Sequence, residues 1–188
     1  MPQKADEEKF IGSANPDYTL GWNNTIDYKN LTFSFLIDGK FGGKFVDMSE
    51  AWYDSRGVSQ RSADARDRGG VLVSGVDAAG KAVSTTVETK AYYQSVGGRG
   101  NIVEPYVYDA TNVRLRQVVI SYNLNVQKYK ILFNNINISL VGRNLFFFHR
   151  PAPFDPDNTI STGINSQSVE NFSLPPTRSI GFNVKFNF

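Results

Sequence analysis

The chain of 188 residues contains no cysteine, one histidine and no long run of apolar residues. Without cysteine, the chain can form neither a disulfide framework nor a thiolate metal site. A transmembrane helix needs about 18 or more consecutive apolar residues, and no stretch approaches that length. The net charge of +2 gives little attraction for a phosphate backbone, so no nucleic acid is expected as a partner.

The residues also give little support for catalysis or for a bound cofactor. His149 is the single histidine, and no nucleophile or second metal ligand accompanies it in the sequence. Asp155, Asp157 and Asn158 carry oxygen atoms that could bind calcium, but the glycine and the distal glutamate of a calcium loop are absent. These three residues are typical of a turn. We therefore predict that the chain is not an enzyme and holds no cofactor.

Aromatic residues, in contrast, are abundant: the chain has 14 Phe and 9 Tyr. Membrane β-barrels place aromatic side chains in girdles at both membrane interfaces. Strands of such barrels alternate apolar and polar residues, so a low mean hydropathy, here −0.33, is compatible with a membrane location.

The segment 178–188 has the clearest pattern in the chain. Its length of about 10 residues suits a tilted strand that crosses a bilayer. One set of alternate positions is wholly apolar: Ile180, Phe182, Val184, Phe186 and Phe188. The other set is small or polar: Ser179, Gly181, Asn183, Lys185 and Asn187. This period of two predicts a strand with one apolar face.

The same reasoning predicts four further strands, at 25–37, 40–52, 112–124 and 134–148. Asp38-Gly39 indicates a tight hairpin turn between the first two. We also expect a small hairpin at 71–76 and 81–87, a short helix around 47–54 and no helix of normal length.

The connections between these strands alternate in length. Short connections fall at Asp38-Gly39 and at 125–133, and long ones at 53–111 and 149–176. Outer-membrane barrels have short periplasmic turns and long extracellular loops. We therefore predict an all-β fold of antiparallel transmembrane barrel strands, with 53–111 and 149–176 outside the cell and the C-terminus in the periplasm.

Five strands are too few for a closed barrel, which needs at least about eight. An open sheet with one apolar face would aggregate through its free edges. We therefore expect residues 1–188 to be the C-terminal segment of a longer protein. The charged stretch Met1–Phe10 has no apolar core, so this sequence is expected to contain no signal peptide and no plug domain.

A series of short motifs supports this interpretation, and the motifs occur in a fixed order along the chain. They are Gly21 with Tyr28-Lys29-Asn30, Gly42-Gly43, Tyr108-Asp109-Ala110, Val113-Arg114-Leu115-Arg116, Ile120-Ser121-Tyr122, Gly142-Arg143-Asn144-Leu145-Phe146 and Asp155-Pro156-Asp157. With the aromatic terminal strand, this set resembles the C-terminal portion of SusC/RagA-type TonB-dependent outer-membrane transporters, from about Phe10 onward. The family usually has Glu where this chain has Asp157, which is a mild departure.

The resemblance implies a complete protein with a 22-stranded barrel in the outer membrane and an N-terminal plug. Such a protein imports bulky nutrients, oligosaccharides or peptides, with energy from TonB, which acts through an N-terminal part that is absent here. A SusD-like surface lipoprotein forms a lid over the extracellular loops. The implied partners of this segment are thus the lipid bilayer, the lid, TonB and the solute.

Two groups of residues are candidates for functional roles. Phe182, Phe186 and Phe188 are predicted to form a recognition signal for barrel assembly, because a terminal strand can add to a sheet edge. Four aromatic residues near the loop ends could contact a sugar ring or the lid, or could belong to the outer aromatic girdle: Trp52, Tyr53, Tyr92 and Tyr93. The positions expected to line the barrel interior are Asn135, Asn137, Ser139, Arg143, Asn183 and Lys185.

Two alternatives to the importer remain open. The chain could be a soluble β-sandwich that binds a ligand, with its apolar strand faces packed on one another. The 59-residue segment from Tyr53 to Thr111 argues against this, because such long loops are uncommon in compact domains. The chain could also be a truncated transporter remnant without function.

Overall fold

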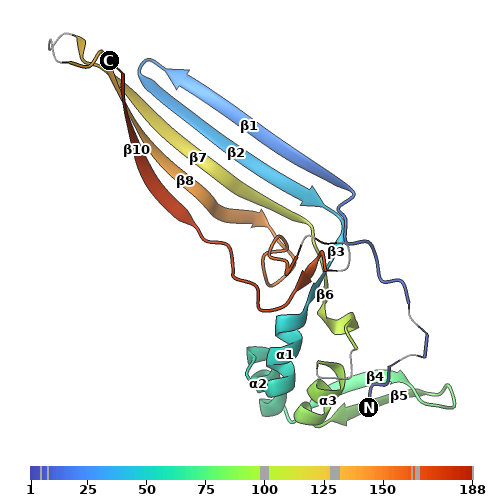
Figure 1. Cartoon of the computed structure of the whole chain (residues 1–188). Coiled ribbons are helices and arrows are strands. Elements are labelled where there is room, and N and C mark those ends of the chain that lie inside the picture. Colours follow the sequence, from blue (N-terminus) through green and yellow to red (C-terminus); the bar gives the residue numbers. More distant parts are fainter. Residues whose placement is uncertain are drawn as a thin grey trace. The chain divides into compact units, whose positions relative to one another are not determined.

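The computed structural model describes residues 1–4, 6–7, 9–97, 102–127, 132–161, 163 and 166–187 (Figure 1). The chain divides into two compact units, each assembled from three stretches of sequence. Unit 1 comprises 1–14, 44–108 and 157–173, and unit 2 comprises 15–43, 109–156 and 174–188. No helix of the described residues is long and apolar enough to cross a membrane.

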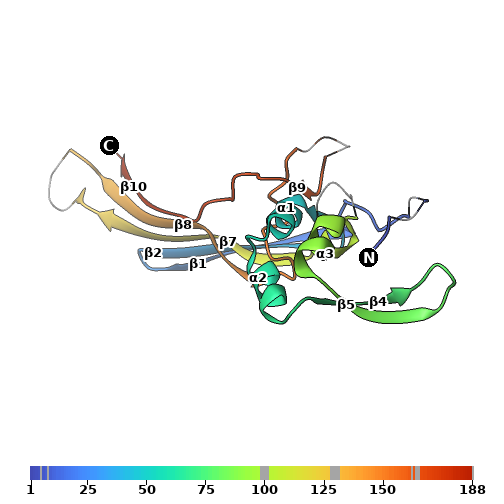
Figure 2. The same ribbon diagram turned by 90° about the horizontal axis from the view of Figure 1, so that it is seen from below.

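Unit 2 is built around one antiparallel sheet of five strands. Its strands, in their order across the sheet, are β1 (Tyr18–Tyr28), β2 (Leu31–Phe41), β7 (Asn112–Asn125), β8 (Asn135–His149) and β10 (Ser179–Asn187). Figure 2 shows this sheet as a single curved layer. The described residues of unit 2 contain no α-helix, so neither face of the sheet is covered by one from within this unit.

The strand register places the apolar side chains of all five strands on one face. Ile26 lies opposite Phe33, Phe33 opposite Ile120, and Ile120 opposite Leu140, which in turn lies opposite Phe182. Many of these side chains are exposed, and Phe182 is 80% exposed. An extended apolar face of this kind is what a barrel wall presents to lipid.

The opposite face, called the polar face below, carries small, amide and charged side chains. Thr32 lies opposite Ser121, which lies opposite Ser139, and Ser139 lies opposite Asn183. Lys185 lies opposite Asn137 on the same face. The six positions predicted to line the barrel interior, which include Asn137, Ser139 and Lys185, therefore share one face of the sheet.

Three of the predicted strands are confirmed. The predictions at 112–124, 134–148 and 178–188 correspond to β7, β8 and β10. Phe188, the last predicted residue of the final strand, lies outside the described residues.

The prediction for the first hairpin is wrong in position. The predicted strand 25–37 includes the end of β1 and most of β2, and the turn lies at Lys29-Asn30, where Lys29 has a left-handed φ of 54°. Asp38-Gly39 lies inside β2, because Asp38 is held across the sheet by Arg116. The predicted return strand 40–52 is also wrong, since β2 ends at Phe41 and a short strand and a helix follow.

The complete strand β1 was missed because Asn24 interrupts its apolar alternation. Tyr18, Leu20 and Trp22 share a face with Ile26 and Tyr28, and Asn24 lies between these two groups on that face. The alternation of short and long connections is nevertheless confirmed. Short turns join β1 to β2 and β7 to β8, whereas long stretches of chain join β2 to β7 and β8 to β10.

Unit 1 contains short strands and helices from the two long connections. The elements are β3 (Lys44–Asp47), α1 (Met48–Arg56), α2 (Gln60–Asp67), β4 (Val71–Val76), β5 (Ala82–Val87), α3 (Thr89–Val96), η1 (Glu104–Tyr106), β6 (Val107–Asp109) and β9 (Val169–Glu170). The strands β6, β3 and β9 form one small sheet, and β4 and β5 form the predicted hairpin. The core contains Ala51, Ala65, Tyr93, Val96 and Tyr106.

The helices of unit 1 have conventional capping residues. Asp47 accepts a hydrogen bond from the backbone N–H of Glu50, Ser59 accepts one from Ser62, and Gly57 ends α1 with a left-handed φ of 72°. The predicted short helix at 47–54 is confirmed by α1. Two further short helices of eight residues each, α2 and α3, lie within the segment 53–111 and were not predicted individually.

Candidate functional site

The four aromatic residues proposed as solute or lid contacts all lie in unit 1. Trp52 and Tyr53 are 38% and 40% exposed on α1, and the edge of Tyr53 meets Phe172 at a ring distance of 5.7 Å. Tyr92 and Tyr93 lie on α3 in edge-to-face contact. Tyr93 is only 6% exposed and packs in the core, which leaves the other three rings better placed to meet a partner.

The three phenylalanines proposed as an assembly signal belong to the last strand. Phe182 and Phe186 lie on the exposed apolar face of β10, and Phe186 contacts Phe133 at a ring distance of 5.0 Å. Phe188 lies outside the described residues. Within unit 2, β10 pairs with β8 only, so its other edge is available for a further strand.

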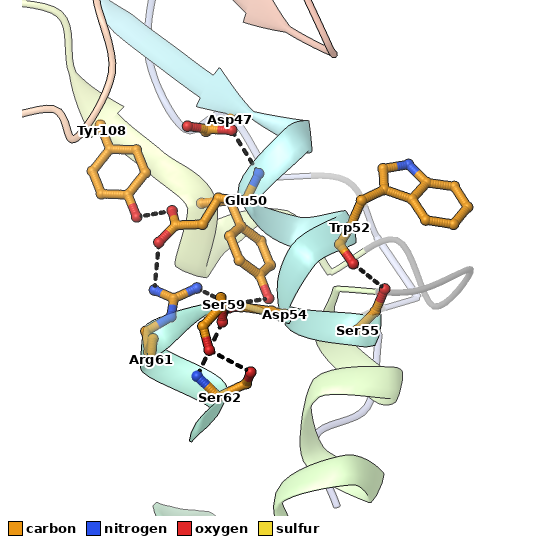
Figure 3. Close-up of polar contacts among 10 residues, drawn as sticks. Asp47, Glu50, Trp52, Asp54, Ser55, Ser59, Arg61, Ser62 and Tyr108 are labelled. Carbon is orange, nitrogen blue, oxygen red and sulfur yellow. Dashed lines mark hydrogen bonds and ion pairs between the residues drawn. The ribbon is translucent and has the colours of Figure 1, made fainter. Parts of the chain in front are cut away.

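A network of polar side chains joins α1, α2 and the segment before β6 (Figure 3). Arg61 pairs with the buried Asp54 and lies 3.4 Å from a carboxylate oxygen of Glu50. The hydroxyl of Tyr106 donates to Asp54 at 3.1 Å, and the hydroxyl of Tyr108 donates to Glu50. Figure 3 also shows the Trp52 ring directed away from this network. The network therefore positions α1, on which Trp52 and Tyr53 lie.

Burial and charge raise the pKa values of three groups in this network, Arg61, Tyr106 and Tyr108. Burial raises the pKa of Tyr106 and of Tyr108, and the neighbouring carboxylates raise both further, so both hydroxyls stay protonated donors. For Arg61, burial alone would lower the pKa, but the ion pairs with Asp54 and Glu50 outweigh burial and raise it. Tyr106 and Tyr108 thus act as hydrogen-bond donors and Arg61 as a cation, which is a structural arrangement.

Two buried carboxyl groups lie together where β3 pairs with β9. Asp47 and Glu170 are register partners in these parallel strands and are 0% and 3% exposed. Asp47 Oδ1 accepts from Glu50 N at 2.8 Å, and Glu170 Oε1 accepts from Ser173 N at 2.9 Å. Within the described part of the chain, the second oxygen of each carboxyl group is buried without a hydrogen-bond partner.

This pairing changes the acidity of Asp47. Burial raises its pKa to about 7, and the negative charges of Glu170 and Glu50 act in the same direction, whereas the hydrogen bond from Glu50 N opposes them. Sequence reasoning missed the pair, because 123 positions separate Asp47 from Glu170 and no local motif marks it.

The polar face of unit 2 carries its own hydrogen bonds. Ser121 donates to Ser139 at 2.9 Å, and Ser139 donates to Asn137 at 2.9 Å. Nearer the long connections, Arg116 Nε donates to Asp38 at 2.7 Å. These contacts fix adjacent strands across the face that is predicted to line a barrel.

A buried ion pair lies close to the long-connection end of this face. The guanidinium group of Arg114 lies 3.1 Å from Asp155, and both side chains are less than a tenth exposed. Asp155 is one of the three oxygen-bearing residues that the sequence predicts to form a turn. The structure shows a turn at Pro156–Asp157 and gives Asp155 a cationic partner instead. No group of acidic or histidine residues suited to a metal ion occurs among the described residues.

The sequence comparisons identify relatives among curated receptors, whereas no family model matches the chain. The chain is 29% identical over 195 aligned residues to TonB-dependent receptor P26 of Formosa agariphila. It is 26% identical over 188 residues to TonB-dependent receptor P3 of the same organism. Each alignment covers 96% of this chain, but the chain spans only 18% and 17% of those receptors.

The chain is also similar in fold to solved structures. The chain matches the RagAB peptide importer in its closed-closed state with a TM-score of 0.67 at 14% identity. It matches the open-open state with a TM-score of 0.68 at 15% identity. Both matches cover 99% of this chain and 19% of the importer chain.

The relatives are receptors and an importer, which agrees with the prediction that the chain is not an enzyme. The antiparallel sheet with one apolar and one polar face is the fold expected of a barrel wall. Both kinds of comparison, made independently, converge on one type of protein. The chain is thus similar in sequence to a segment of TonB-dependent receptors and shares its fold with a segment of the RagAB importer.

Proposed function

We propose that this segment forms part of the wall and of the extracellular loops of an outer-membrane importer for oligosaccharides or peptides. The observation that carries the proposal is the sheet of unit 2, whose exposed apolar face suits lipid and whose polar face suits a hydrated interior. The alignments to TonB-dependent receptors over 96% of the chain support it. In this arrangement the C-terminus lies in the periplasm and unit 1 lies outside the cell.

We further propose that unit 1 meets a SusD-like lipoprotein lid through its exposed aromatic residues. Trp52, Tyr53 and Phe172 are each between a third and two thirds exposed, and Tyr53 and Phe172 contact each other. Exposed aromatic side chains are enriched where protein surfaces associate. The polar network of Arg61 fixes the helix that carries two of these rings.

The import function is tested by deleting the transporter gene and measuring growth on oligosaccharides and on peptides as sole nutrients. We expect growth on one class of solute to be lost and to return with the full-length gene. A full-length protein that lacks residues 15–43 should fail to restore growth, because the barrel wall is incomplete. Unchanged growth of the deletion strain on every solute would contradict the proposal.

A further inference from the structure

A pocket of about 390 Å³ lies in unit 2 where β7, β8 and β10 meet the long connections. Its volume falls within the range of small-molecule sites, about 300–1,000 Å³. Three arginines from separate stretches of chain line it: Arg114 on β7, Arg150 after β8 and Arg178 before β10. The pocket is therefore lined by side chains from stretches of chain that are distant in the sequence.

The charges around this pocket do not balance within the segment. Arg114 is paired with Asp155. Among the described residues, Arg150 and Arg178 form no ion pair or hydrogen bond, and the guanidinium group of Arg150 lies 4.9 Å from the centre of the Phe147 ring. The Arg114 guanidinium also lies 4.8 Å from that ring. With Arg114 neutralised by Asp155, the pocket has a surplus of two positive charges.

The walls of the pocket are rigid and largely apolar. Pro153, Pro175 and Pro176 line it, and proline fixes the backbone φ angle. Asn144, in a left-handed conformation with φ 51°, donates to the carbonyl of Thr177 at 3.3 Å. This bond ties the segment before Arg178 to β8.

We infer that this pocket is a subsite for a carboxylate group of the imported solute, bound between the guanidinium groups of Arg150 and Arg178. Guanidinium groups bind carboxylates through paired hydrogen bonds, and apolar walls strengthen such contacts by excluding water. The space exceeds what a single carboxylate needs, so it also accommodates the sugar ring or peptide unit that carries the acid. The inference rests on the proposed import function and narrows its substrate to acidic oligomers.

The test uses the full-length transporter and compares matched acidic and neutral oligomers. The probes are hexagalacturonate against maltohexaose, and hexa-aspartate against hexaserine, with binding measured by calorimetry. We expect one acidic oligomer to bind at least about tenfold more tightly than its neutral counterpart, the gain from one charge-assisted contact. The pair that shows this preference identifies the solute as glycan or peptide.

The variant R150Q/R178Q should lose that preference, whereas R66Q, which removes an exposed arginine of α2 in unit 1, should retain it. Heat-modifiable migration of each variant checks that its barrel has assembled. The variant R150K/R178K keeps the charge without the paired geometry and should show an intermediate preference.

Equal binding of acidic and neutral oligomers by the wild type, or an unchanged preference in R150Q/R178Q, would overturn the inference. So would a structure of the full-length transporter in which one of its own carboxylates occupies the pocket. If any of these results is obtained while neutral oligomers are still imported, the inference fails but the proposed import function stands. If no oligomer is imported in a TonB-dependent manner, both fail.

Discussion

At the scale of single residues, the facing carboxyl groups of Asp47 and Glu170 make the stability of unit 1 depend on pH. Asp47 has a pKa of about 7 in the folded chain and 3.8 as its ordinary value. The folded state thus holds a proton that the unfolded state releases as pH rises above 3.8. The contribution of protonated Asp47 to the free energy of unfolding is fully present below about pH 4 and is lost as pH rises through about 7.

The variant D47N should remove most of this dependence. Asparagine caps a helix as well as aspartate does, so the bond to Glu50 N is kept while the titrating group is lost. The measurement is hydrogen exchange in the full-length transporter at pH 8, corrected for intrinsic rates. In D47N, the backbone amides of 44–50 and 168–173 should exchange more slowly than in the wild type. Replacement of the exposed Glu104 by Gln should have no effect, and parallel pH profiles of D47N and wild type would refute the assignment.

The pair between Arg61 and Asp54 should also contribute measurably. The variant R61Q leaves Asp54 buried without its cation, which costs about 3–5 kcal/mol for a fully buried pair. Arg61 is 38% exposed, so we expect about 2 kcal/mol, seen as faster exchange throughout α1 and α2. The surface pair between Arg66 and Asp67 is the control, and R66Q should change local stability by less than about 0.5 kcal/mol. An R61Q exchange pattern equal to that of R66Q would show that the buried pair contributes little.

At the scale of the elements, the two faces of β8 and β10 should have different environments. Single cysteines at Ile138 and Phe182 in a cysteine-free form of the full-length transporter should resist water-soluble maleimides, because lipid covers the apolar face. Cysteines at Asn137 and Asn183 should react when the interior is hydrated. Labelling that fails to alternate along either strand would contradict the assignment of the two faces.

The strand β10 could be predicted because it carries an unbroken apolar alternation in Ile180, Phe182, Val184 and Phe186. The first hairpin could not be located, because Asp38-Gly39 has the composition of a turn while Asp38 forms a long-range bond to Arg116. The helices α2 and α3 are only eight residues long, too short for a clear apolar period. Their capping residues, Ser59 and Glu88, were the available local evidence.

The candidate sites depend still more on tertiary contacts. The exposed rings of Trp52 and Tyr53 could be proposed from the sequence, because aromatic residues near loop ends are recognisable there. The partners of Arg114 and Asp47 could not be predicted from the sequence, because each residue is paired with one more than 40 positions away. The arginine pocket joins three distant stretches of chain, and no local pattern brings Arg150 and Arg178 together.

At the scale of the whole molecule, the central claim is that this chain is part of a much larger outer-membrane transporter. The chain spans 17–19% of the proteins that it matches, and its sheet has two free edges among the described strands. Free edges beside an apolar face favour pairing with further strands. In the proposed barrel, such strands would lie beside β1 and β10.

The most direct test is an immunoblot of native outer membranes with an antibody raised against residues 53–111. The account predicts a heat-modifiable band several times larger than 21.0 kDa in the outer-membrane fraction, as expected for an intact barrel that carries this segment. A band of 21.0 kDa in the soluble fraction would contradict the account and would favour an independent β-domain or a truncated remnant.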